Sequence, residues 1–165
     1  LRRWRLNRDK ALDTFVTVAH RVVWATVATV DARGRPRSRV VHPIWQRSGD
    51  GLVGWVFTRP TSVKLAHLAR VPYVSCAYHD TSTYDVAVAE CDAERVDDAD
   101  VRRTVWDLFE NGPAPVGYDP RILGVADPLD ERITVLRMDP WRLSTSSALP
   151  DVPRRAWTRP AGGAP

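Results

Sequence analysis

Three hydroxyl groups and one ammonium group lie close together in the sequence, on Thr58, Thr61, Ser62 and Lys64. Pro60 ends the β-rich stretch before them, and the apolar spacing that follows is typical of a short helix. The first N–H groups of a helix have no partner inside it, and the helix dipole favours a negative charge there. Hydroxyls and a cation at such a position suit a phosphate group. The alternative is an ordinary solvated helix start with serine or threonine capping.

The use of lysine at position 64 supports the phosphate interpretation. Lys10 and Lys64 are the only lysines among the 24 basic residues, so the other 22 are arginines. A compact ammonium group fits beside a single phosphate more easily than a wide guanidinium group does.

A strand, a short helix and a second strand must position these side chains. The segment 52–58 is rich in β-forming residues with a spacing of two. A helix is expected over 63–69, with Val63 on its buried side, and Pro72 ends it. The segment 73–79 then returns to a β pattern.

The same patterns predict the rest of the chain. Further strands are expected over 22–30, 37–46, 84–96 and 132–138, and helices over 9–20 and 99–110. Pro43 cannot donate to a strand ladder, so the segment 37–46 is expected to be bent, bulged or at an edge. Residues 1–8 show no clear period. From Ser144 onward the chain is rich in Pro, Ala, Gly and Ser and is predicted to lack regular structure.

These elements predict a mainly β protein. About six strands joined as hairpins, with two to three peripheral α-helices, favour a small Greek-key barrel. Apolar residues on both faces of 22–30 fit a closed or covered sheet. We expect one domain over residues 1–145 and a Pro/Ala/Gly-rich C-terminal tail over 146–165.

Composition narrows the function classes. A hydrophobic share of 44% and a charged share of 27% are ordinary for a globular protein, and no stretch approaches the about 18 apolar residues of a membrane helix. The net charge is +4, but the arginines are dispersed without interleaved aromatics, so nucleic-acid binding is not expected.

Cys76 and Cys91 lack metal-ligand spacing, and no metal site is expected. They are interpreted as free thiols in a reducing cytosol, with a disulfide as the alternative.

Three segments together resemble the flavin-binding split β-barrel superfamily named after pyridoxamine 5′-phosphate oxidase, which also holds deazaflavin-dependent reductases. They are ATVDARGRPRSRVVHPIW (28–45), VFTRPTSVKLAHLARVPYVSCAYH (56–79) and VAECDAERVDD (88–98). Their order and spacing carry the resemblance, which covers about half of the chain.

The resemblance implies a cofactor bound across the second and third strands at a dimer interface. It places the isoalloxazine ring and its ribityl chain along Arg39, Val40, Val41, His42 and Pro43. Phe57 and Thr58, at the end of the third strand, are assigned to the same site. Ser62 and Lys64 match the family's phosphate ligands, in agreement with the argument from the helix start.

The chain departs from the oxidase itself at three places. The oxidase usually has an arginine just before the lysine, where this chain has Val63. The oxidase also has a glutamine on a later strand that contacts the ring, and the corresponding position here falls near Asp85 or Val86. Its Arg- and Trp-bearing end, which binds the pyridoxal ring, has only a faint counterpart at 141–143. Oxidation of vitamin B6 is therefore not expected.

The function implied by the resemblance is an FMN-dependent oxidoreductase. It would act on a small-molecule redox substrate as a cytoplasmic homodimer. One alternative is a reductase of the same fold that uses the deazaflavin coenzyme (F420), with some arginines holding its longer acidic tail. Another is a flavin-binding stress or storage protein without turnover, because no acid–base pair stands out. The sequence identifies neither a catalytic residue nor the substrate.

Overall fold

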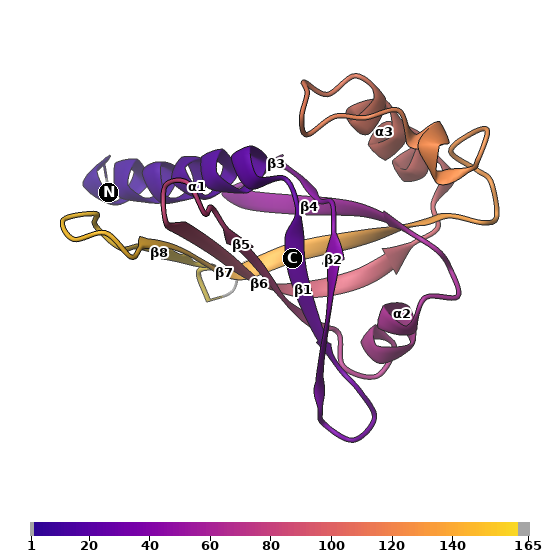
Figure 1. The fold of residues 1–165 in the computed structure, drawn as a ribbon, viewed down its shortest axis with the longest axis horizontal. Helices are drawn as coiled ribbons and strands as arrows, with labels where there is room; N and C mark the ends of the chain where they lie inside the picture. The colour runs from indigo at the N-terminus through magenta and orange to yellow at the C-terminus, as the bar shows by residue number, and fades with distance from the viewer. Residues whose placement is uncertain (1, 162–165) are drawn as a thin grey trace.

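The computed structural model describes residues 2–161, with side chains from Leu6 onward, and is built on one antiparallel sheet (Figure 1). The helices are α1 (Arg2–Val22), α2 (Val63–Leu68), α3 (Ala99–Glu110) and the 3-10 helix η1 (Pro120–Leu123). The strands are β1 (Ala25–Val30), β2 (Pro36–Val41), β3 (Ile44–Ser48), β4 (Gly51–Thr58), β5 (Tyr73–His79), β6 (Asp85–Val96), β7 (Thr134–Ser147) and β8 (Arg155–Thr158).

The order of the strands requires the sheet to curl. The main path runs β2-β1-β5-β6-β7-β4-β3, and β8 pairs with β7. In a flat sheet the outer strands of this seven-strand path would lie about 29 Å apart, at about 4.8 Å per strand. Yet only His42 and Pro43 connect β2 to β3, and the chain from Val41 to Ile44 spans at most about 11 Å. The two edges therefore approach each other without pairing, as in a split barrel.

This architecture confirms the predicted mainly β split barrel with peripheral helices. The described residues form eight strands instead of about six. The predicted segment 37–46 divides at Pro43 into two strands, because proline interrupts the ladder there.

The first helix is longer than predicted. Helix α1 begins at Arg2, although residues 1–8 were expected to form an irregular arm. Leu6 is 66% exposed, so it adds no buried apolar position from which a helical period could be read. At the other end, Val23 adopts a left-handed backbone with φ 71°, and β1 therefore begins at Ala25 and not at residue 22.

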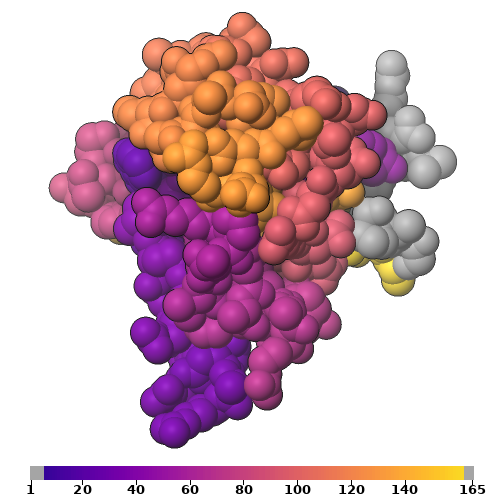
Figure 2. Space-filling model, turned by 90° about the vertical axis from the view of Figure 1, so that its right-hand side faces the viewer, coloured from indigo at the N-terminus to yellow at the C-terminus, as the bar shows by residue number. Residues whose placement is uncertain are grey.

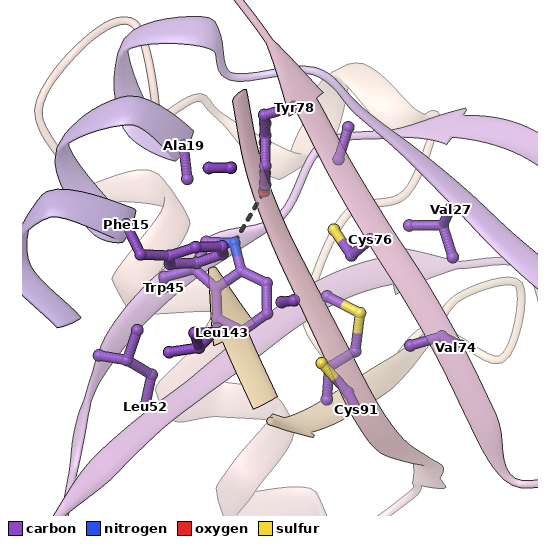
Figure 3. Packing of buried hydrophobic residues seen from close by; sticks show 14 of the residues in the cluster. Phe15, Ala19, Val27, Trp45, Leu52, Val74, Cys76, Tyr78, Cys91 and Leu143 are labelled. Atoms are coloured by element: carbon purple, nitrogen blue, oxygen red, sulfur yellow. Dashed lines mark hydrogen bonds between the residues drawn. The ribbon is translucent and has the colours of Figure 1, made fainter. Parts of the chain in front are cut away.

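The main core fills the barrel beneath α1 (Figure 3). Phe15 of α1 packs edge-on against Trp45 at 5.1 Å between ring centroids, and Trp45 Nε1 donates to the buried Tyr78 hydroxyl at 2.7 Å. A Cβ on Gly54 would lie 2.7 Å from the Trp45 ring, so glycine is needed there. The structure therefore fixes Trp45 by a hydrogen bond and by close packing.

Both cysteines belong to this core. Cys76 and Cys91 are fully buried and free. Burial raises the pKa of Cys76 to about 12 and raises that of Cys91 as well. These thiols therefore stay protonated and unreactive at neutral pH.

A second apolar cluster lies between α3 and the outer side of β4 and β7. It contains Phe57, Val105, Trp106, Phe109 and Val135 among its buried members. Helix α3 has the predicted bounds, and Asp98 caps it by accepting hydrogen bonds from the N–H groups of Asp100 and Val101. Among the described residues, no helix is both long enough and apolar enough to cross a bilayer.

The expectation of an irregular chain after Ser144 is wrong. Strand β7 continues to Ser147 and crosses the predicted boundary at residue 145, and β8 pairs with it over Arg155–Thr158. Trp157 is only 8% exposed and joins the main core. Pairing with β7 supplies the order that this polar stretch does not encode locally. Residues 162–165 of the predicted tail lie outside the described residues.

Trp157→Ala is expected to lower the free energy of unfolding by about 3–5 kcal/mol, because it removes a buried aromatic ring. Urea unfolding measures this change. Trp141→Ala, at an exposed position of β7, is the matched control and is expected to change stability by about 0.5 kcal/mol or less. Equal effects of the two variants would contradict the docking of β8.

Candidate functional site

Strand β2 turns Arg39 toward the inside of the barrel. Directly opposed residues of antiparallel strands point to the same face, and Arg39 lies opposite the buried Val27 of β1. Arg39 Nη1 donates to Thr29 Oγ1 at 2.7 Å and to the Val27 carbonyl oxygen at 3.3 Å. These two bonds hold the guanidinium group against β1.

A second cation, Lys64, lies half-buried in the first turn of α2. Burial lowers the pKa of Lys64, and the charge of Arg39 lowers it further. The pKa of Arg39 is lowered by burial and then by Arg37. Over residues 6–161, neither Arg39 nor Lys64 has a carboxylate oxygen within 4.0 Å. Two partly buried cations without a counter-charge are unfavourable, so a bound anion would stabilise this pair.

The predicted hydroxyl groups lie at the start of α2. Ser62 is the N-cap residue, but its side chain makes no capping bond. Thr58 Oγ1 instead donates to Ser62 Oγ at 3.2 Å. Helix α2 has only six residues, so the two cations contribute more to an anion site than its dipole does.

The expected burial of Val63 is wrong. Its side chain is 61% exposed. The buried side of α2 consists of Leu65, His67 and Leu68. Because residue 63 is a valine, the surface beside Lys64 lacks the additional positive charge that an arginine would supply.

A cavity of about 870 Å³ adjoins these residues. One wall is the end of β4 and its connection to α2, and the other is η1 with the residues just before β7; Figure 2 views this face, with the segment around η1 in orange beside magenta β4 and α2. The lining residues are Phe57, Thr58, Arg59, Pro60, Thr61, Ile122, Leu123, Gly124, Glu131, Arg132 and Ile133. The volume suits a cofactor-sized or drug-sized ligand. The cavity thus includes Phe57 and Thr58 but not the two cations.

His42 lies on the other side of β2, in an aromatic cluster. Its ring is 4.8 Å from Tyr118, 5.1 Å from Trp24 and 6.1 Å from Phe109, between centroids. Phe57 also contacts Phe109, at 5.2 Å. His42 Nε2 lies 2.7 Å from the Val116 carbonyl oxygen, which can only accept, so Nε2 carries the hydrogen.

The remaining predicted positions do not form one continuous surface. Val40 is 63% exposed on the outer face of β2, whereas Val41 packs against the main core and Pro43 is buried. Alternation along β2 therefore separates the predicted strip into inner and outer residues.

Two residues that the sequence analysis did not single out complete the inner group. Thr29 of β1 and His67 of α2 are buried, and Thr29 Oγ1 lies 2.8 Å from His67 Nδ1. For His67, the spacing of three residues from Lys64 could have predicted that both side chains lie on the same side of α2. Across the described chain, no three His, Cys, Asp or Glu residues converge as a metal site.

Two histidines, His20 and His42, have a lowered pKa. Trp45 donates its backbone N–H to His20 Nε2 at 3.0 Å, so this nitrogen carries no hydrogen. Burial lowers the pKa of His20, and the charge of His42 lowers it further. Burial also lowers the pKa of His42, despite the opposing bond to Val116.

Acidification is expected to destabilise the protein through these histidines. Both have a lower pKa in the folded state than the about 6.5 of an unfolded histidine, so below about pH 6.5 the unfolded chain binds more protons. The free energy of unfolding should fall as the pH drops from about 7 to 5, by at most about 1.4 kcal/mol per pH unit for each histidine.

Urea unfolding across this range measures the effect. His20→Gln, which keeps an acceptor for the Trp45 N–H, should make the dependence shallower, whereas the exposed His79→Gln should leave it unchanged. If the free energy of unfolding depended on pH identically in wild type and His20→Gln, this assignment would be contradicted.

Comparison with known proteins places this geometry in a family. The sequence pattern of the pyridoxamine 5′-phosphate oxidase family matches residues 9–140. No curated protein matches the chain.

Several solved structures share the fold. A protein related to general stress protein 26, of the pyridoxinephosphate oxidase family, from Clostridium acetobutylicum is 14% identical, with 92% of this chain and 95% of that chain covered and a TM-score of 0.64. A pyridoxamine 5′-phosphate oxidase-related, FMN-binding protein from Nostoc punctiforme is 16% identical, with coverage of 95% and 96% and a TM-score of 0.59. PhzG from Burkholderia lata, in complex with tetrahydrophenazine-1-carboxylic acid, is 20% identical, with coverage of 98% and 85% and a TM-score of 0.60.

At these identities the structural likeness shows the fold alone. The match over 9–140 spans more than half of the 165 residues. The chain therefore belongs to the pyridoxamine 5′-phosphate oxidase family.

Proposed function

We propose that this protein binds FMN and uses it as an oxidoreductase acting on a small molecule. The observation that carries the proposal is the pair of uncompensated cations, Arg39 and Lys64, beside the hydroxyl groups of Thr58 and Ser62. A phosphate monoester would supply the missing negative charge and acceptors for all four side chains. Membership of a family with FMN-binding relatives supports a flavin as the carrier of that phosphate.

The surroundings also suit the rest of a flavin. The cavity beside Phe57 and Thr58 combines apolar side chains, such as Ile122 and Ile133, with polar ones, and could hold a planar ring. His42 is not among its lining residues, but its Nδ1 remains free to accept because Nε2 is bonded to Val116. Bound FMN supplies hydride and electron transfer chemistry. The protein's part is to anchor the phosphate, shape the ring pocket and exclude water.

We further propose a homodimer, with a second copy against the outer face of β2, β1 and β5. The outward residues on this face are small or apolar: Thr26, Ala28, Ser38, Val40, Ser75 and Ala77. Such a surface lets two sheets approach closely. Val40 is 63% exposed in the single chain, so a partner copy would cover an apolar side chain next to Arg39.

A specific observation favours a second candidate cofactor, the deazaflavin coenzyme F420. Arg37 lies opposite Thr29, on the same face of β2 as Arg39. It has no carboxylate partner within the described residues. A row of cations therefore leads from the phosphate position toward the hairpin turn, where a longer acidic tail could lie.

A non-catalytic flavin-binding protein is the third candidate. The exposed Val63 replaces a cation beside the phosphate position, and the inner group contains no carboxylate for acid–base work. Bound flavin that is reduced chemically but returns no electrons to any added acceptor, followed by its absorbance, would favour this candidate over an enzyme.

Parallel titration of the apo-protein with FMN, riboflavin and F420, followed by ligand fluorescence, tests the cofactor. We expect FMN to bind more tightly than riboflavin, because only FMN carries the phosphate. Selective binding of F420 would replace FMN with the deazaflavin, and binding of none of the three would contradict the proposal.

Lys64→Ala is expected to weaken FMN binding by about 1–3 kcal/mol, because it removes a charge-assisted hydrogen bond. Riboflavin affinity should not change. Lys10→Ala, at the exposed lysine of α1, is the matched control and should bind both ligands like wild type. An unchanged FMN affinity in Lys64→Ala would exclude Lys64 from the phosphate site.

A further inference from the structure

A buried hydrogen-bonded chain lies behind Arg39. Arg39 Nη1 is 2.7 Å from Thr29 Oγ1, and Thr29 Oγ1 is 2.8 Å from His67 Nδ1. Thr29 is 1% exposed and His67 is 9% exposed. The chain therefore joins three elements, β2, β1 and α2, with Thr29 and His67 buried and Arg39 partly exposed.

The hydrogens of this chain can be assigned from its partners. The two hydrogens of Arg39 Nη1 go to Thr29 Oγ1 and to the Val27 carbonyl oxygen. Thr29 thus accepts from Arg39 and has one hydrogen of its own to donate. Its only other hydrogen-bond partner among the described residues is His67 Nδ1. Because the buried Thr29 hydrogen has no other acceptor among these residues, we assign His67 Nδ1 as its acceptor and the ring hydrogen to Nε2.

This arrangement orients Arg39 without neutralising it. Thr29 and Val27 offer uncharged acceptors, so the guanidinium group keeps its full charge. Arg39 Nε and Nη2 have no partner among the described residues, and that edge stays available for an anion. His67 lies one helical turn after Lys64 on α2, so its bond to Thr29 also ties the helix that carries Lys64 to the strand that holds Arg39.

We propose that Thr29 and His67 are positioning residues, which fix Arg39 and Lys64 relative to each other for the phosphate of the cofactor. This inference rests on the proposed function, because it concerns the phosphate of the same site. A guanidinium group held in place before binding loses less freedom when the phosphate arrives. The two residues act through Arg39 and Lys64 and do not themselves contact the ligand.

The first test compares three substitutions by titration with FMN and with riboflavin. Thr29→Val removes the hydroxyl but keeps the shape, and should lower FMN affinity about tenfold while riboflavin affinity stays unchanged. Thr29→Ser restores the hydroxyl and should restore the FMN-to-riboflavin ratio of affinities. Thr158→Val, an exposed threonine of β8, is the matched control and should leave that ratio at the wild-type value.

The same comparison applies to His67. Asparagine places an oxygen acceptor near the position of Nδ1, so His67→Asn should keep most of the ratio, whereas His67→Leu should lower it like Thr29→Val. A merely structural role would lower both affinities together. Equal losses for FMN and riboflavin, or no loss in Thr29→Val, would overturn the proposal.

A ligand-free measurement separates this proposal from the proposed function. The ¹⁵N NMR spectrum of the imidazole rings should show His67 neutral with its hydrogen on Nε2 in wild type, and a changed Nδ1 signal in Thr29→Val. A hydrogen on Nδ1 would overturn the hydrogen-bonded chain. The expected tautomer together with equal FMN and riboflavin affinities in wild type would refute the phosphate site, and with it the positioning role, while leaving the chain itself correct.

Discussion

The short connection of His42 and Pro43 joins strands at opposite edges of one sheet. It forces the edges together, and the barrel follows from that constraint. It also determines which side chains lie on each side of the line where the two edges meet. Alternation along β2 sends Arg39 inward over β1, whereas His42, just past the strand, lies among aromatic rings next to α3. Arg39 and the aromatic cluster around His42 therefore lie three residues apart in the sequence but in different surroundings.

Several arginines of the described chain are paired with carboxylates, although the buried Arg102 is held by the backbone carbonyl oxygens of Asp130 and Ile133. Arg21 is paired with Asp80 and Asp85, and Arg35 is paired with Asp31. Arg39, in contrast, is held by a hydroxyl group and a carbonyl oxygen, which orient a cation and leave its charge uncompensated. Burial without a counter-charge is unfavourable in the free protein, and an anion bound beside Arg39 and Lys64 would offset this cost. This is the basis of the proposed phosphate site.

Local signals in the sequence were sufficient for much of the fold and part of the site. The apolar period of α3 and the Asp98 cap predicted that helix with its observed bounds, and Pro43 predicted the break between β2 and β3. The hydroxyl groups and Lys64 at the start of α2 were predicted from residue types alone. Each of these features depends on neighbours within a few residues, which a sequence displays directly.

The features that the sequence analysis missed depend on distant partners. Thr29 and His67 are 38 residues apart and meet only because α2 packs on β1. Strand β8 has one buried anchor, Trp157, and is otherwise ordered by pairing with β7. Val63 has the apolar character of a core residue but is 61% exposed, whereas the polar His67, one turn later on α2, is buried. Polarity alone could not rank these two positions.

A crystal structure of the protein with FMN would test the central claim most directly. The account predicts the phosphate within hydrogen-bond distance of Lys64 Nζ and of the free edge of Arg39, with Arg39 Nη1 still bonded to Thr29. A phosphate bound elsewhere, such as beside Arg59 or Arg132 in the cavity next to η1, would contradict it.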